Sequence, residues 1–117
     1  MKDIEKPGSH EECQATMLPI KDTLEVLHGK WKLPILVALI TKTMRFKEIS
    51  REVNGITDKV LSKELKDLEI NELIKREVID TFPPTVKYSI TPHGESLKDV
   101  IIAMKTWGDK HRTKIMR

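Results

Sequence analysis

Cysteine is nearly absent from this sequence. The 117 residues include only Cys13, so the chain cannot form an intramolecular disulfide or a multi-cysteine zinc site, and its composition fits a reducing compartment. A continuous run of about 18 apolar residues is also missing, and the N-terminus MKDIEKPGSHEE lacks the apolar core of a signal peptide. We therefore expect a cytoplasmic protein with no membrane partner.

Patterns that carry catalysis are missing as well. The four histidines show no metal-ligand spacing, and His10-x-x-Cys13 supplies too few ligands for structural zinc. The sequence has no glycine-rich phosphate loop and no Ser, His and Asp set that suggests a triad. Aromatic residues make up 4%, and Trp31 and Trp107 lie on apolar helical seams that indicate core or dimer anchors. We expect no metal, no cofactor and no enzyme activity.

The size and charge of the chain favour a small basic domain. At 38% hydrophobic residues, the chain suits one compact unit with a small core, which a second copy could enlarge. Residues 1–29 hold three lysines and six acidic residues, a net charge of −3, whereas residues 30–117 hold eighteen basic and twelve acidic residues, a net charge of +6. An acidic front end thus masks a basic body. The pI of about 9.0 is common among nucleic-acid binders and also among other soluble proteins, so the placement of the charges has to decide.

Apolar residues recur at helical spacing through the first part of the chain. Residues 1–12 show no such period and are predicted to be a flexible tail, followed by a single domain over residues 13–117. A first helix is predicted over residues 17–28, because Gly29 can form a left-handed cap at its end. The dense apolar residues of 30–42 predict a buried core helix.

Two further helices are predicted on either side of a tight turn. The first covers residues 45–53 and ends at Asn54-Gly55, since both residues accept the positive φ of a reversal. Thr57, or Asp58 beside it, can cap a helix over residues 57–70. The leucines of this helix share one side, and the side facing away from them carries Lys59, Ser62, Lys63 and Lys66.

The hydrophobic period changes after this helix. Residues 73–79 and 86–90 are short β-branched runs, and the prolines of DTFPPT between them cannot lie within a ladder, so a hairpin is predicted. Thr91-Pro92 then starts a last helix that extends to about Ile115 and is ~36 Å long. The predicted fold is mainly α with a small β-hairpin, in the order of a winged helix-turn-helix.

Three sequence blocks support this interpretation by resemblance. GKWKLPIL, RFKEISREVNGITDKVLSKELKDLE and PPTVKYSITPHGESL are similar, in the same order, to the signature blocks of the HxlR-type family of winged-helix regulators. The resemblance extends from Cys13 to Trp107. It implies a MarR-like arrangement and a prokaryotic, cytoplasmic, dimeric repressor or activator whose first and last helices form the interface. We place that interface at Leu24, Leu27, Ile101, Ile102, Met104 and Trp107.

The partner implied is double-stranded DNA, bound by a homodimer at a pseudo-palindromic operator. In the fourth helix Thr57, Lys59, Ser62 and Lys63 are expected at base edges, and Lys66 at a phosphate. Other basic residues are expected near the DNA backbone, beside the third helix and in the wing at about 74–90, namely Arg45, Lys75, Arg76 and Lys87. The alternatives are solvated surface charge, or a winged-helix protein-interaction module with only non-specific DNA affinity.

The sequence departs from the family at two positions near the wing. The family usually has an acidic residue where this chain has Lys87, and a glycine where it has Glu72. Lys87 could add a phosphate contact, and Glu72 should stiffen the turn after the recognition helix.

Cys13 resembles the N-terminal cysteine that senses oxidants or electrophiles in some members of the family, so a small-molecule or oxidant effector is one hypothesis. His10 or Lys21 would favour its reactive thiolate, whereas Glu11 and Glu12 would disfavour it. Cys13 also lies farther from the GKW block than usual. The other hypothesis is a thiol that is unreactive or exposed in the tail.

Overall fold

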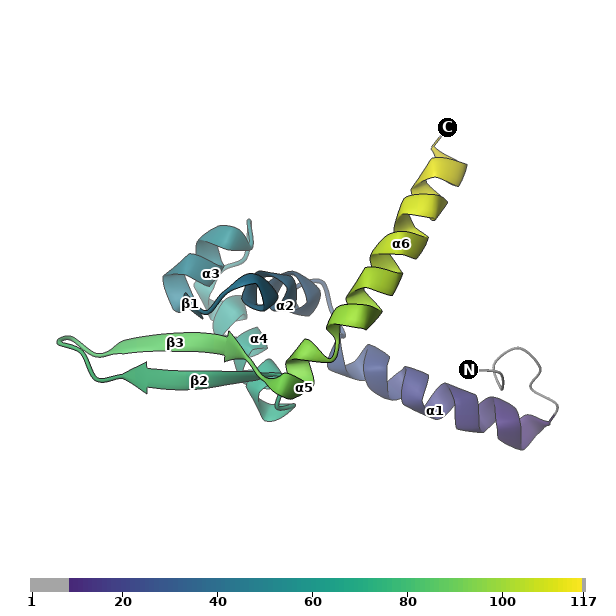
Figure 1. Ribbon diagram of the computed structural model, residues 1–117, viewed down its shortest axis with the longest axis horizontal. Coiled ribbons are helices and arrows are strands. Elements are labelled where there is room, and N and C mark those ends of the chain that lie inside the picture. Colours follow the sequence, from purple (N-terminus) through teal and green to yellow (C-terminus); the bar gives the residue numbers. More distant parts are fainter. Residues whose placement is uncertain (1–8, 117) are drawn as a thin grey trace.

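The computed structural model describes residues 9–116, which form a winged helix-turn-helix body with two projecting helices (Figure 1). The β2–β3 hairpin extends from one end of the body, and α1 and α6 diverge from the other end. The elements in chain order are α1 (His10–Val26), α2 (Lys32–Thr41), β1 (Met44–Arg45), α3 (Phe46–Glu52), α4 (Asp58–Ile70), β2 (Ile74–Ile79), β3 (Thr85–Ile90), α5 (Pro92–Glu95) and α6 (Lys98–Ile115).

Helix α1 begins earlier than its apolar period predicts. The Ser9 side chain accepts a hydrogen bond from the amide of Glu12 at 3.1 Å, and the acidic Glu11 and Glu12 suit the positive end of the helix dipole. Of the expected tail, residues 1–8 lie outside the described residues, whereas residues 10–12 form the first helical turn. The signal for this helix start is a polar N-cap side chain, which the spacing of apolar residues does not reveal.

The core lies among α2, α3, α4 and the sheet. Ile35, Leu36 and Leu39 of α2 pack with Ile49 of α3 and the leucines of α4, all of them buried. Leu61 is fully buried, which confirms the predicted register of α4. Gly55 has a φ of +91° in the turn between α3 and α4, as the positive-φ prediction required.

The C-terminal end of α4 forms a Schellman motif without glycine. The amide of Glu72 donates to the carbonyl of Glu69 at 2.9 Å, and the amide of Leu73 donates to the carbonyl of Leu68 at 3.0 Å. Glu72 adopts a φ of +60°, a left-handed conformation that side chains disfavour. The glycine expected here from the family would adopt it more readily.

The sheet has three strands, one more than the predicted hairpin. All pairs are antiparallel, and the strand order is β1-β3-β2. Strand β1 is only two residues long, with Met44 opposite Tyr88 and Arg45 opposite Lys87. Such a short strand has no alternation to detect, so the sequence did not reveal it.

The predicted last helix is two helices. Thr91 caps α5 as expected, accepting from the amide of Gly94 at 2.9 Å, but the helix ends at Glu95 and a new axis begins at Lys98 (Figure 1). At the joint, the Leu97 amide donates to Gly94 three residues back, which tightens the turn. A Cβ on Gly94 would lie 2.1 Å from the carbonyl oxygen of Leu73. The break therefore follows from tertiary docking of α5.

Helices α1 and α6 contain no residue buried within the subunit. None of the helices in residues 9–116 is long and apolar enough to span a membrane.

Candidate nucleic-acid interface

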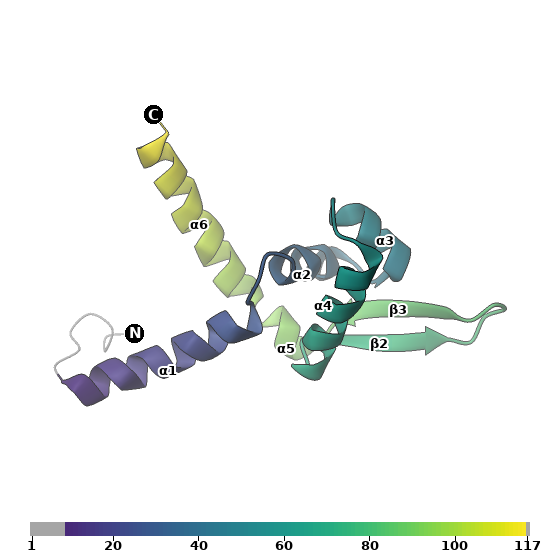
Figure 2. The same ribbon diagram turned by 180° about the vertical axis from the view of Figure 1, so that it is seen from behind.

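The outward face of α4 carries the residues that the sequence singled out for base contacts. Thr57 caps the helix by accepting from the amide of Val60 at 3.2 Å, and its own hydroxyl hydrogen can still be donated to DNA. Figure 2 shows α4 on the near side of the body. The leucines of this helix are buried in the core. The exposed residues of this basic face are Thr57, Lys59, Ser62, Lys63 and Lys66.

A shallow cleft of about 300 Å³ lies between α4 and the sheet. Ser62 and Lys66 line it from α4, and Arg76 and Tyr88 line it from paired positions of β2 and β3. Side chains alternate across a strand, so Arg76 lies on the sheet face toward α4 and its neighbour Lys75 lies on the other face. Arg76 thus lies beside α4 rather than on the outer face of the wing.

A second basic group lies across the base of the wing. Arg45 of β1 is paired with Lys87 of β3, and both line a cleft of about 340 Å³. The amide of Arg45 donates to the Glu48 carboxylate at 2.8 Å, and this hydrogen bond lowers the pKa of Glu48. The Arg45 Nε lies 3.5 Å from the same carboxylate. A phosphate would therefore compete with Glu48 for Arg45.

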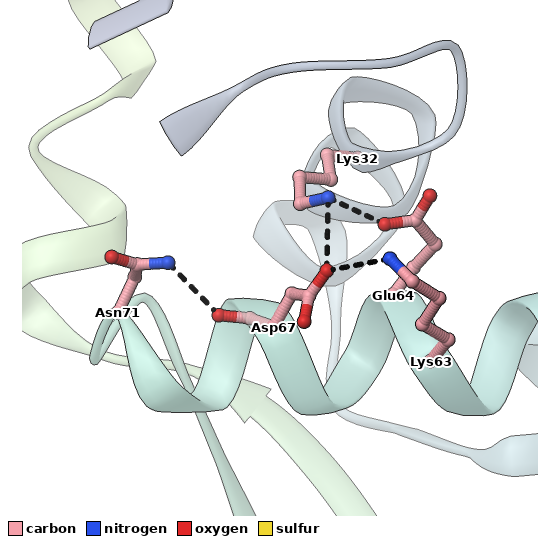
Figure 3. A network of polar contacts seen from close by, with 5 residues as sticks. All are labelled: Lys32, Lys63, Glu64, Asp67 and Asn71. Atoms are coloured by element: carbon pink, nitrogen blue, oxygen red, sulfur yellow. Dashed lines mark hydrogen bonds and ion pairs between the residues drawn. The ribbon is translucent and has the colours of Figure 1, made fainter. Parts of the chain in front are cut away.

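A buried ion pair connects α2 to α4. Lys32 is only 4% exposed, and its Nζ lies 2.5 Å from Glu64 Oε1 and 3.4 Å from Asp67 Oδ2 (Figure 3). Burial lowers the pKa of Lys32, but the hydrogen bonds and negative charges of Glu64 and Asp67 outweigh burial and raise it overall. The charged lysine thus anchors α4 from behind.

The same cluster reaches the basic face through Asp67. Lys63 Nζ lies 3.1 Å from Asp67 Oδ2, one helical turn away (Figure 3). The pKa of Asp67 is lowered, first by the hydrogen bond from Lys63 and then by that from Lys32. Sequence reasoning missed Lys32, Glu64 and Asp67. The available signal was a lysine at the first position of an otherwise apolar helix, because a lysine that is buried there needs a partner of opposite charge.

The proposed dimer residues differ in their exposure to solvent. Leu27 is buried in the core of the subunit, so it offers little surface to a partner. Trp107 is 66% exposed and stacks on His111, with ring centroids 4.8 Å apart. Ile101 is half-buried, and the remaining residues are exposed on α1 or α6, namely Leu24, Ile102 and Met104.

Cys13 is exposed in the N-terminal part of α1. His10 precedes it by one turn, but Lys21 is eight residues further along, about 12 Å along the helix axis, and is not beside the thiol. Within residues 9–116, no three His, Cys, Asp or Glu side chains gather as metal ligands would.

Residues 26–116 match the sequence profile of the HxlR-like helix-turn-helix family. The chain belongs to this family. Among its relatives, the HTH-type transcriptional regulator YdeP of Bacillus subtilis is 40% identical over 97 residues, which cover 83% of this chain and 76% of YdeP. The protein is accordingly a DNA-binding transcriptional regulator of the HxlR type.

Solved structures show the same winged-helix architecture. A transcriptional regulator of the MarR family from Enterococcus faecalis V583 has a TM-score of 0.78 and 35% identity, covering 84% of this chain and 89% of that one. The redox regulator HypR in its reduced form has a TM-score of 0.76 and 37% identity, covering 80% of this chain and 93% of that one. The HxlR-type chain therefore has the predicted MarR-like arrangement.

Proposed function

We propose that this HxlR-type regulator binds a pseudo-palindromic operator as a homodimer, with α4 in the major groove. The observation that carries the proposal is the exposed basic face of α4, whose opposite side is fixed in the core. Thr57, Lys59, Ser62 and Lys63 contact base edges, and Lys66 with Arg76 contacts a phosphate beside the cleft. Arg45, Lys75 and Lys87 contact the backbone near the wing.

Two-fold symmetry gives each half-site one recognition helix. The half-site centres then lie roughly 34 Å apart, or a small multiple of that distance. About six lysines and arginines would neutralise phosphates. The logarithm of the binding constant should then fall linearly with the logarithm of the salt concentration, with a slope of about −0.9 for each neutralised phosphate.

The test compares two DNA fragments. Purified protein is titrated at two salt concentrations with the DNA upstream of its own gene and with an unrelated duplex of equal length. Preference for the upstream fragment supports a sequence-specific regulator acting near its gene. Equal, salt-sensitive binding to both fragments, together with no enrichment from a random-sequence pool, would contradict the proposal and favour the protein-interaction module.

The unpartnered helices support the homodimer. Helices α1 and α6 bury no residue within the subunit, yet they expose large apolar side chains such as Leu24 and Trp107. Trp107→Glu should halve the mass measured by sedimentation and weaken operator binding, because a charge in an apolar interface is costly. Val37→Glu, an exposed apolar position on α2, should leave the mass unchanged.

We also infer an oxidant response through Cys13. The exposed thiol lies on a proposed interface helix, and HypR, a structural neighbour, is described as a redox regulator with reduced and oxidised forms. Oxidant should cross-link wild-type subunits on a non-reducing gel and change operator binding. A Cys13→Ser variant that responds to oxidant like the wild type would contradict this role.

A further inference from the structure

An acidic side chain lies at the edge of the basic face of α4. Asp67 is one turn from Lys63, and its Oδ2 is 3.1 Å from the Lys63 ammonium. A carboxylate at a DNA-facing surface repels phosphates, so its position there weakens binding to any duplex. The contacts of Asp67 indicate what this carboxylate contributes to DNA binding in place of the lost affinity.

Asp67 is held in place from the protein interior. Lys32 lies 3.4 Å from its Oδ2, and Lys32 is itself buried and fixed by Glu64 at 2.5 Å. Of the two lysines bound to Asp67, Lys32 cannot turn toward solvent without breaking a buried ion pair. Lys63 has a side chain that is 69% exposed, so it is the partner that DNA can reach.

The cluster is electrically balanced. Lys32 and Lys63 offset Glu64 and Asp67, as Figure 3 shows, and the Lys63 contact is the first cause of the lowered pKa of Asp67. Asp67 therefore stays ionised at neutral pH. While this contact persists, the charge of Lys63 is already compensated and contributes little to the counterion release that drives non-specific DNA binding.

The contact also restricts the direction of the Lys63 side chain. An ammonium has three N–H donors on a flexible stem, and Asp67 occupies one of them. The other two can donate to acceptors on a base edge without breaking the contact with Asp67. An unrestrained lysine would instead swing to whichever phosphate is nearest.

We propose that Asp67 is a specificity-determining residue that holds Lys63 for base contacts and keeps it from phosphates of arbitrary sequence. Lys32 acts through Asp67 and is a positioning residue. The proposal rests on the proposed role of α4 as the helix that contacts bases, and it adds an acidic residue and a buried lysine to the residues that determine operator preference.

The decisive variant is Asp67→Asn, which removes the charge and keeps the shape. Binding is measured over a salt series on an unrelated duplex and on a duplex that the wild-type protein has selected from a random pool. On the unrelated duplex, the variant should bind more tightly, with a log-log salt slope steeper by about 0.9, because Lys63 gains a phosphate. The preference for the selected duplex should fall at least about fivefold, the lower end of one base contact.

Two controls isolate the contact. Asp109→Asn on α6 makes the same charge change and breaks the same kind of pair, since Lys105 Nζ lies 2.8 Å from Asp109 Oδ2. This variant should leave the salt slope and the preference for the selected duplex unaltered. In a Lys63→Ala background, Asp67→Asn should no longer steepen the slope. An unchanged slope in the single variant, or an equal steepening without Lys63, would overturn the proposal.

Failure of the proposed operator binding has a different signature. A wild-type protein that enriches no sequence from the pool would contradict that function and, with it, any role of Asp67 in specificity. The salt slope on the unrelated duplex would still report separately whether Asp67 holds Lys63.

Discussion

The contribution of the buried Lys32 to stability depends on its ion-pair partners. Removing it leaves Glu64, also buried, without a cation, so Lys32→Met should lower the free energy of unfolding by about 3–5 kcal/mol in urea titrations. The double variant Lys32→Met/Glu64→Met should recover most of that loss, because two apolar side chains can replace a buried pair. A double variant as unstable as the single one would contradict this account.

The same lysine gives a pH dependence of known sign. Its pKa in the folded protein is raised above the ordinary 10.5, since Glu64 and Asp67 outweigh the effect of burial. The stabilisation is fully present below the unfolded-state pKa and is lost as the pH rises through the higher folded-state pKa. In strongly alkaline solution, wild-type protein should therefore lose more stability than Lys32→Met does.

Lys63 and Lys87 should differ in what they contribute to DNA binding. Lys63→Ala should relax sequence preference with little change in salt slope, because Asp67 already neutralises this lysine. Lys87→Ala should weaken binding to all duplexes alike and flatten the slope by ~1. Salt titrations on selected and unrelated DNA measure both effects. Equal effects of the two variants would mean that Lys63 contacts only phosphates.

At the scale of the element, Glu72 strains the C-terminal end of α4, because its side chain disfavours the left-handed backbone conformation. Glu72→Gly should raise the free energy of unfolding by roughly 0.5–1 kcal/mol, because glycine adopts the φ of +60° without steric cost and loses only part of the gain to backbone entropy. Asn71→Gly, at the preceding residue with a φ of −83°, should give no such gain. Thermal and urea unfolding of both variants provide the comparison.

The docking of α5 depends on a glycine. Gly94→Ala would place a Cβ 2.1 Å from the Leu73 carbonyl oxygen, so we expect a destabilisation of at least about 1–3 kcal/mol. Gly108→Ala on α6 meets nothing within 4 Å in the subunit and should stabilise by about 0.5–1 kcal/mol through helix propensity. Similar urea midpoints for the two variants would contradict the close approach of α5.

The elements that sequence could predict are those with local causes. The caps at Thr57 and Thr91 and the turn at Gly55 were confirmed, because side-chain chemistry and φ preference act within a few residues. The pairing of β1 with β3 and the break before Lys98 depend on contacts with segments that are distant in the sequence. The exposed positions of the candidate site followed from helical periodicity, whereas the partner of Lys32 could not be located without the packing of α2 on α4.

For the whole molecule, stability should depend on protein concentration. The apolar surfaces of α1 and α6 are open in the single subunit, and the proposed association would remove them from water. The thermal midpoint should therefore rise with protein concentration, as mass action requires for a folded dimer that unfolds to monomers. Differential scanning calorimetry over a wide concentration range measures this rise, and a constant midpoint would argue against the dimer.

The joint at Ser96–Leu97, between α5 and α6, determines the direction in which α6 leaves the body. Helix α6 has 18 residues and is about 27 Å long, so a rotation of roughly 10° at the joint moves its far end by about 5 Å. In a dimer built through α6, that displacement is transmitted to the separation of the two recognition helices. One more base pair between half-sites requires about 3.4 Å. In the proposed dimer, the stiffness of this two-residue joint would therefore be one limit on how much variation in half-site spacing the protein tolerates.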